Sequence, residues 1–408
     1  RRVDAPRFPR LPHAAHPAVF PSCASIFPHR PPLRLAVYLS ATSKWRSPRS
    51  AGSAQLFHGR ASMRRDLADA LMTEQLLFLS FRELPAVACV SQRHARLCRS
   101  DRVRERKRHL QRLAARGRIA AGSNFSAALR DDGRVVVWGS DVASIRRSFE
   151  PTHTGFVAIA SSFRHVVALR NDGSVVTAGL HDDSPTDAGY RAIACGGSHC
   201  VGLRSPDGSV VTWGNPLPGH REDTPTGAGY VAIACGFQHS VALHQCGRVT
   251  VWGHTQLDQG ADAPTDAGYK AIACGDVHSI ALRREDGRVV EWGPRLRTPT
   301  QHAPMDAGYI AVAAGRSHTV ALHNDGRVVT WGSSKDHQFD DAPTDAGYVA
   351  IACGLSHSVG LRSDGTVVTW GSNEDNQRDD APTDTGYVAI ACGRDHSVGL
   401  RDDGSIVT

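Results

Sequence analysis

Histidine is the strongest candidate for a chemical role in this sequence, because it recurs at one position of a repeating pattern. The series consists of His165, His199, His239, His278, His318, His357 and His396. Several are followed by a hydroxyl residue, as in His239-Ser240, which could suggest a base beside a nucleophile. Neighbouring side chains of a strand point to opposite faces, however. We therefore interpret these histidines as hydrogen-bonded structural groups and predict neither catalytic residues nor an enzyme.

Cysteine occupies a second repeated position. Five of the ten cysteines are equivalent to one another: Cys195, Cys235, Cys274, Cys353 and Cys392. Equivalent sites on neighbouring repeats should lie beyond the roughly 7 Å Cα separation that a disulfide tolerates. We expect reduced thiols that pack as small apolar groups, which suits a cytoplasmic or nuclear protein. The sequence shows no Cys/His zinc spacing and no phosphate-binding glycine-rich loop, so we predict no metal and no cofactor.

Arginine marks a third position, just before a recurring Asp-Gly pair. The six members are Arg130, Arg170, Arg204, Arg283, Arg362 and Arg401. Two interpretations stay open. The arginines could form a basic ring that holds an acidic partner, which makes them candidate partner-binding residues. Alternatively, most of them pair locally with the turn aspartates. Acidic pairs such as Asp340-Asp341 lack the spacing of a calcium loop and are expected to be solvated.

The pattern that carries these residues begins near Gly117 and is marked by a Trp-Gly pair. The last five pairs begin at Trp213, Trp252, Trp292, Trp331 and Trp370, at intervals of 39, 40, 39 and 39 residues. The clearest unit, Tyr348–Gly371, contains three strand signals. Asp364-Gly365 separates the second signal from the third and supplies the positive φ angles of a tight hairpin turn.

A unit of about 39 residues is too small to fold alone, so its sheet must be buried against neighbouring copies. We predict an all-β fold over residues 117–408: a single β-propeller of seven or eight short three-stranded blades. The last repeat is incomplete, because it stops at Thr408 where the next Trp is expected. Either the chain is truncated, or its end pairs with a strand expected at 118–121.

The connectors between Trp-Gly and the next repeat differ while the frame stays fixed. Such loops are typical of a rigid scaffold that presents a binding face, and the alternative is neutral drift in solvated loops. We therefore expect a protein partner on one face of the propeller.

The chain ahead of the repeats is different in charge. Residues 1–117 hold 23 Lys+Arg and 7 Asp+Glu, a balance of +16, and the remainder holds 24 and 33, a balance of −9. Residues 1–62 are rich in Arg, Pro and Ser, and we predict that they are disordered. An organelle-targeting segment and sequence upstream of a true start at Met63 are both consistent with this composition.

Residues 63–116 have leucines at helical spacing. No stretch is apolar and long enough for a membrane helix, and neither membrane nor nucleic acid is a predicted partner.

The repeated phrase A-C-G-x-x-H-S-V-A-L-x-x-D-G-x-V-x-x-W-G resembles the regulator of chromosome condensation repeat over about residues 117–408. The resemblance implies a protein-binding propeller. The family includes a nuclear exchange factor for the small GTPase Ran and modules of HECT-type ubiquitin ligases. The present units lack the Gly-Gln-Leu-Gly stretch after Trp-Gly and any long insertion that resembles the exchange wedge. Ran exchange activity is therefore not expected.

The helical segment 63–116 resembles an F-box. The match includes Leu71, Leu76 and Leu84, while Ala68 and Gln75 depart from it. The resemblance implies docking to Skp1 of a Skp1–cullin ubiquitin ligase, and a generic helical lead-in is the alternative. Our functional hypothesis is a non-catalytic substrate receptor of such a ligase. The alternative is a stand-alone interaction propeller that acts on a small GTPase or chromatin.

Overall fold

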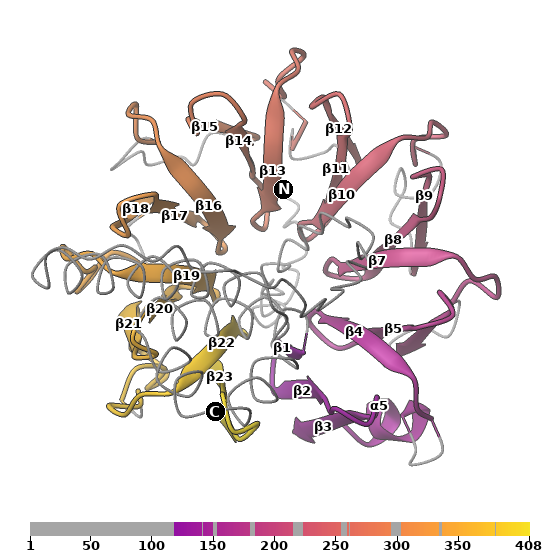
Figure 1. Cartoon of the computed structure of the whole chain (residues 1–408), viewed down its shortest axis with the longest axis horizontal. Helices are drawn as coiled ribbons and strands as arrows, with labels where there is room; N and C mark the ends of the chain where they lie inside the picture. Colours follow the sequence, from indigo (N-terminus) through magenta and orange to yellow (C-terminus); the bar gives the residue numbers. More distant parts are fainter. Residues whose placement is uncertain are drawn as a thin grey trace, which may run out of the picture. The chain divides into compact units, whose positions relative to one another are not determined.

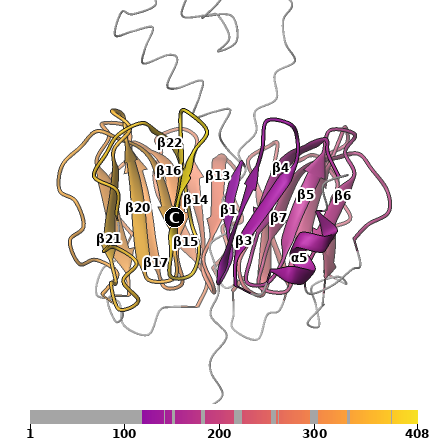
Figure 2. The ribbon, with the colours of Figure 1, turned by 90° about the horizontal axis from the view of Figure 1, so that it is seen from below.

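Eight small antiparallel sheets are arranged around a common axis in the computed structural model (Figure 1). The structure describes residues 118–408, apart from 141, 150–152, 180–183, 215–222, 254–258, 261, 295–302, 334–336 and 380. Each sheet has three strands, and each strand is bonded to the next one along the chain. The side view shows these strands running along the wall of the ring (Figure 2). We refer to the sheets as blades 1 to 8 in chain order.

Each blade has one inner, one middle and one outer strand (Figure 1). The inner strands are β1 (Ile119–Ala121), β4 (Phe156–Ser161), β7 (Tyr190–Cys195), β10 (Tyr230–Cys235), β13 (Tyr269–Cys274), β16 (Tyr309–Ala314), β19 (Tyr348–Cys353) and β22 (Tyr387–Cys392). The middle strands are β2 (Phe125–Leu129), β5 (Val166–Arg170), β8 (His199–Arg204), β11 (His239–His244), β14 (Ser279–Arg283), β17 (His318–His323), β20 (His357–Arg362) and β23 (Ser397–Arg401). The outer strands are β3 (Val135–Gly139), β6 (Val175–Ala178), β9 (Val210–Gly214), β12 (Val249–Gly253), β15 (Val289–Trp292), β18 (Val328–Gly332), β21 (Val367–Gly371) and β24 (Ile406–Val407).

The Asp-Gly pair makes the turn between the middle and outer strands, as the sequence predicts. In blade 7, Gly365 adopts a φ of +91°, a conformation that glycine tolerates without steric cost. The Oδ1 atom of Asp364 accepts a hydrogen bond from the amide of Thr366, at 2.9 Å. The aspartate therefore satisfies a backbone donor that the turn would otherwise leave without a protein partner.

The two sides of each blade have complementary shapes. At the interface of blades 3 and 4, small or aliphatic side chains of blade 3, such as Ala192, Ala194 and Val201, pack against Tyr230 and Trp252 of blade 4. The same pairing of alanines and valines with Tyr and Trp recurs between blades 4 and 5. In each interface, one side of a blade therefore packs against the opposite side of the next blade. Such head-to-tail contacts close into a ring when the rotation from one blade to the next divides a full turn evenly.

The ring closes between blade 8 and blade 1. The Nε2 atom of His396 lies 2.9 Å from the hydroxyl of Ser126, and the amide of Arg394 donates to the carbonyl of Gly122 at 3.2 Å. These contacts repeat those between other neighbouring blades. The last interface is therefore built from the same kinds of contact as the interior ones.

The predicted all-β propeller is confirmed, and the number of blades is eight. The alternative in which the chain end pairs with residues 118–121 is wrong. β1 pairs with β2, and β24 pairs with β23, in two separate sheets. Side-chain packing and hydrogen bonds between turns, rather than a shared sheet, join the first blade to the last.

One short helix lies in the first connector. The helix α5 (Ala143–Ser148) buries Ile145, which joins Val142 and Phe149 in the core between blades 1 and 2. Among the described residues, no helix is long and apolar enough to cross a membrane.

Buried tryptophans on the outer strands are tied to the preceding blade. The indole Nε1 atoms of Trp213 and Trp370 donate to the hydroxyls of Thr177 and Thr330, at 2.9 and 3.1 Å. The Nε1 atom of Trp292 is buried without an acceptor among the described residues. Val251 stands in blade 4 at the place of this threonine, immediately before Trp252. The orphaned donor thus follows from a single residue of the previous repeat.

Substitution Val251→Thr is expected to raise the free energy of unfolding by about 1 kcal/mol, because the new hydroxyl gives the indole of Trp292 its acceptor. Urea denaturation of the full chain measures the change. The matched control is Thr330→Val, which orphans Trp370 and should lower the same free energy by about 1–3 kcal/mol. A Val251→Thr protein no more stable than the parent would contradict this account.

Candidate functional site

The repeated histidines form a belt of hydrogen bonds between blades. In each bond, the imidazole Nε2 atom meets a hydroxyl of the following blade at 2.8–3.0 Å. The pairs are His199–Ser240, His239–Ser279, His278–Thr319, His318–Ser358, His357–Ser397 and His396–Ser126. The predicted structural role is confirmed for these six histidines.

A Gly-x-x-His turn between the inner and middle strands, or Ser-x-x-His in blade 2, places each imidazole. In blade 7, the amide of Gly354 donates to the carbonyl of His357 at 2.8 Å, which folds the turn back on itself. A Cβ atom at Gly354 would lie 2.1 Å from Cε1 of the His357 ring. Glycine is therefore required here because the ring lies directly over its Cα atom.

The belt also produces a contact that we did not expect from the sequence. His239 and Ser240 point apart, as predicted, but Ser240 meets His199 of the preceding blade at 2.8 Å. This separation matches that of a catalytic base and its nucleophile. His199 and Ser240 are 1% and 0% exposed, however, so a substrate has no access to the hydroxyl. Burial, and not geometry, excludes nucleophilic catalysis at this pair.

Burial also sets the charge of the belt. It lowers the pKa of His318 to about 3 and that of His357 to about 4, and the neighbouring histidines add to the shift. The pKa values of His278 and His396 are lowered for the same main reason. These imidazoles are thus neutral at physiological pH.

The arginines lie on the opposite face of the ring, at the ends of the middle strands; we name this the arginine face. Arg204, Arg283, Arg362 and Arg401 each pair with an aspartate 17 residues earlier, on the segment that leads into the inner strand. Those partners are Asp187, Asp266, Asp345 and Asp384. The interpretation of local pairing therefore holds for these four, but the partner is not the turn aspartate. The turn aspartates cap backbone amides instead, as Asp364 does.

The same guanidinium groups lie over the aromatic ring that begins the inner strand. The Cζ atom of Arg283 is 5.2 Å from the ring centroid of Tyr269, and its Nη2 atom is 2.6 Å from Asp266. The Tyr269 hydroxyl also donates to Asp266, at 2.7 Å. Most of the charge on this face is thus neutralised within each blade.

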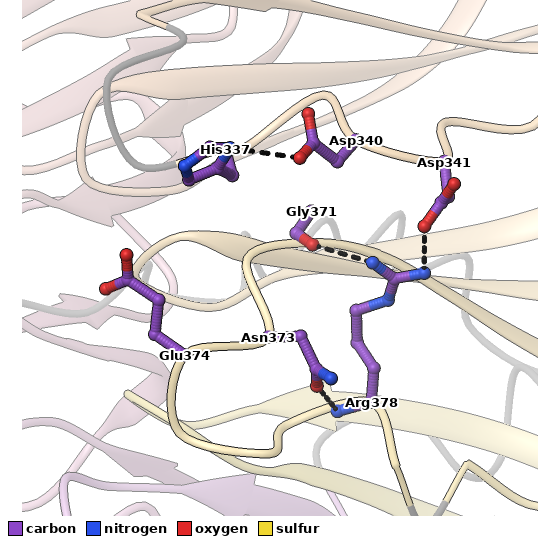
Figure 3. A pocket seen from close by; sticks show the side chains of 7 residues that line it. All are labelled: His337, Asp340, Asp341, Gly371, Asn373, Glu374 and Arg378. Atoms are coloured by element: carbon purple, nitrogen blue, oxygen red, sulfur yellow. Dashed lines mark hydrogen bonds and ion pairs between the residues drawn. The ribbon is translucent and has the colours of Figure 1, made fainter.

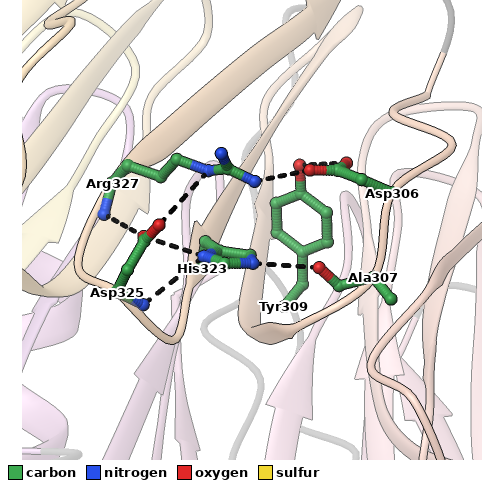
Figure 4. A network of polar contacts seen from close by, with 6 residues as sticks. All are labelled: Asp306, Ala307, Tyr309, His323, Asp325 and Arg327. Carbon is green, nitrogen blue, oxygen red and sulfur yellow. Dashed lines mark hydrogen bonds and ion pairs between the residues drawn. The ribbon is translucent and has the colours of Figure 1, made fainter.

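Blade 6 reaches the same arrangement with other residues (Figure 4). His323 stands at the arginine position, and its Nε2 atom lies 2.9 Å from the carbonyl of Ala307. Arg327, beyond the turn, reaches Asp306 in its place. The aspartate keeps a guanidinium partner although the usual arginine is missing.

Two predicted arginines depart from this scheme. Arg170 lies 5.1 Å over the ring of Phe156, and His153 occupies the place of the lead-in aspartate. The side chain of Arg130 is 63% exposed, with Asp132 3.8 Å from its Nε atom. Among the six predicted arginines, these two therefore form no ion pair with a lead-in aspartate in the described part of the chain.

The other face carries the Gly-x-x-His turns, and we name it the turn face. Backbone hydrogen bonds link neighbouring turns, such as Gly197 to Phe237 at 3.0 Å and Leu355 to Arg394 at 3.1 Å. The residue after the glycine, or after Ser162 in blade 2, is of six types around the ring: Ser123, Phe163, Gly197, Phe237, Asp276, Arg316, Leu355 and Arg394. A fixed backbone ring therefore carries varied residues, of which Phe163, Phe237, Arg316 and Arg394 are partly exposed.

A polar hollow of about 510 Å³ opens between the connectors that follow blades 6 and 7 (Figure 3). It is lined by His337, Asp340, Asp341, Asn373, Glu374 and Arg378. The guanidinium of Arg378 donates to Asp341 at 2.5 Å and to the carbonyl of Gly371 at 3.0 Å. The cation inside the hollow compensates part of the acidic lining. Gly371 pairs with His357 across the strands, so the hollow lies toward the turn face.

Other predicted residues fall outside the part of the chain that the structure describes. Leu71, Leu76 and Leu84 lie there, together with most of the variable connectors. The ring also brings together three residues that sequence spacing did not connect: His165 of the segment before β5, and Cys195 and Cys200 of blade 3. They are separated by 30 and 5 positions, which is not a metal-binding spacing, so only the fold could reveal them.

Comparison with known sequences and structures identifies the repeat. The regulator of chromosome condensation (RCC1) repeat matches residues 118–142, 190–216, 230–259, 309–338 and 348–377. Residues 118–408 form a β-propeller, and five of its eight blades match the RCC1 repeat. No curated protein matches the sequence.

Two plant receptor-kinase ectodomains are similar to this chain in fold. The ACR4 CRINKLY ectodomain from Arabidopsis thaliana is 21% identical over 62% of this chain and 94% of its own, with a TM-score of 0.52. The CR4 ectodomain from Physcomitrella patens is 22% identical over 62% and 73%, with a TM-score of 0.50. Prp20p from Saccharomyces cerevisiae, described with its binding to Gsp1p and histones, is 18% identical over 70% and 83%, with a TM-score of 0.44. At these identities the likeness concerns the fold alone.

The neutral histidine belt predicts a loss of stability in mild acid. Unfolding returns each imidazole to a pKa near 6.5, so the unfolded chain binds protons that the folded RCC1 propeller does not. Stability is complete above pH 6.5 and falls below it. At pH 5 the loss should be about 2 kcal/mol for each such histidine.

Denaturant titrations at pH 7.5, 6 and 5 measure this dependence. The control is His357→Gln, whose amide can still bond Ser397 but does not titrate, so the slope below pH 6.5 should be shallower by one histidine. A free energy of unfolding that is flat from pH 7.5 to 5 would show that the belt is not neutral in the folded chain.

Proposed function

We propose that this chain is a non-catalytic, protein-binding adaptor that holds its target on the turn face. The observation that carries the proposal is that eight backbone turns of one geometry carry six different residue types at the same position. A rigid frame with variable side chains at its rim suits recognition of one particular surface. The arginine face is the less suitable binding surface, because in most blades its charged side chains are already paired with each other.

The chemistry of the turn face favours a partner that is partly apolar and partly acidic. Phe163 and Phe237 are half-buried aromatic residues, and the exposed guanidinium of Arg164 lies 5.0 Å over the Phe163 ring. Arg394 lies on the same ring of turns, with its Nε atom 2.9 Å from the carboxylate of Asp395. Aromatic and arginine side chains dominate the binding energy of many protein interfaces.

The finer proposal is that the adaptor is the substrate receptor of a Skp1–cullin–F-box ubiquitin ligase. It rests on the F-box resemblance of residues 63–116, immediately ahead of the propeller. The segment supplies a docking element for the ligase, and the propeller supplies a target-binding surface. Action on a small GTPase or chromatin is the competing function, which the repeat family favours.

Purified Skp1 is expected to bind the full chain, and Leu76→Asp should weaken this binding at least tenfold, because it places a charge at one of the leucines that carry the F-box resemblance. Calorimetry or interferometry measures the affinity. Met305→Ala, at an exposed propeller residue, is the control and should leave Skp1 binding intact. Absence of Skp1 binding by the parent chain would remove the ligase role, and acceleration of nucleotide release from a Ran-type GTPase would support the competing function.

Binding of the target should depend on the turn face. In a proximity-labelling experiment, the double variant Phe163→Ala/Phe237→Ala is expected to lose the proteins that the parent labels, while it keeps Skp1. Arg283→Ala on the arginine face is the matched control and should keep both. Loss of the target set by the arginine-face variant alone would overturn the choice of face.

A further inference from the structure

The histidine belt changes its chemistry at the interface of blades 2 and 3. Blades 4, 5 and 7 place a serine opposite a cysteine of the same blade, with the Oγ atom 3.7–3.9 Å from the Sγ atom. In blade 3 the serine is replaced by Cys200, which is paired across the strands with Cys195. The histidine that faces this pair is His165, so a histidine and two thiols stand where other interfaces have a histidine, a hydroxyl and a thiol.

The three donor atoms are close and buried. The Sγ atoms of Cys195 and Cys200 lie 3.7 Å apart, and one imidazole nitrogen of His165 completes a group within 4.8 Å. The three residues are only 4%, 1% and 1% exposed, in the order His165, Cys195, Cys200. The Nε2 atom of His165 has no hydrogen-bond partner among the described residues, unlike the Nε2 atoms of the other six histidines.

We propose that His165, Cys195 and Cys200 bind one divalent ion of the zinc class. Two cysteines and one histidine are an established donor set for zinc. Two thiolates at about 2.3 Å from a tetrahedral ion lie about 3.8 Å apart, which is close to the separation of these sulfurs. An open S–S distance of 3.7 Å also means that the pair is not a disulfide.

Charge balance favours a divalent ion over a monovalent one. Two thiolates and a neutral imidazole around a divalent ion form a site with no net charge. The neutral site costs least in this buried position, since the desolvation of an uncompensated charge is expensive.

The ion would join two blades, because His165 belongs to blade 2 and both cysteines belong to blade 3. It would therefore replace the histidine–hydroxyl bond that this interface lacks. Binding to the folded ring and not to the unfolded chain would stabilise the propeller.

The test compares the full chain with Cys200→Ser, which restores the residue that blades 4, 5 and 7 carry and should therefore fold. After exposure to Zn(II) and removal of loose metal, the parent is expected to retain about one equivalent more zinc than the variant, because the site holds a single ion. Replacement by Co(II) should give the parent a thiolate-to-metal charge-transfer band that the variant lacks. Zn(II) should also raise the melting temperature of the parent more than that of the variant.

Cys246→Ser, at an exposed cysteine far along the repeats, is the matched control and should behave like the parent. Equal zinc retention by the parent and by Cys200→Ser would overturn the proposal. Stoichiometric binding of Cu(I) with no cobalt–thiolate band would overturn the assignment to a divalent ion. These readouts do not depend on Skp1 or on a target, so their failure would leave the proposed adaptor function untouched.

Discussion

The contact between neighbouring blades is the interaction on which the rest of the propeller depends. A single three-stranded sheet of about 39 residues cannot bury enough apolar surface to be stable alone. Each blade therefore offers a face of alanines, valines and leucines to the Tyr, Ile, Cys and Trp side chains of the next. The histidine–hydroxyl bonds run through these interfaces and stay neutral because burial excludes the protonated imidazole. Apolar packing supplies the main driving force, and the polar belt fixes how one blade is set against the next.

The apolar packing lies between the blades. The residues on the two faces of the ring therefore contribute less to stability, and the two faces differ in how much they contribute. The arginine face uses its charged residues within each blade, where a guanidinium is held between an aspartate and an aromatic ring. On the turn face, the glycine of each Gly-x-x-His turn makes room for the imidazole that packs against it. Of the intervening residues, Phe163, Phe237, Arg316 and Arg394 stay partly exposed, and a binding surface can be built from them.

Departures from the repeat have their consequences in the adjacent blade. Val251 in blade 4 leaves the indole of Trp292 in blade 5 without an acceptor. Glu291 in blade 5 takes the threonine's place and accepts a hydrogen bond from Trp331 of blade 6, at 2.8 Å. Cys200 in blade 3 changes what His165 of blade 2 can bind. A substitution in one repeat thus alters the hydrogen bonding of a residue about 40 positions away. This happens because equivalent positions of successive blades are neighbours in space.

The sequence by itself determined the repeat, the three strands of each unit, the Asp-Gly turns and the closed all-β ring, because periodic apolar strands and positive-φ glycines are local signals. It also determined that the histidines are structural. Only the tertiary structure decided that His199 bonds to Ser240, that Arg283 pairs with Asp266 and not with the turn aspartate, and that His165 meets Cys195 and Cys200. Those contacts join residues 5 to 41 positions apart across strands and blades. They depend on the register of each sheet and on the rotation between blades, and neither quantity is encoded in any one repeat.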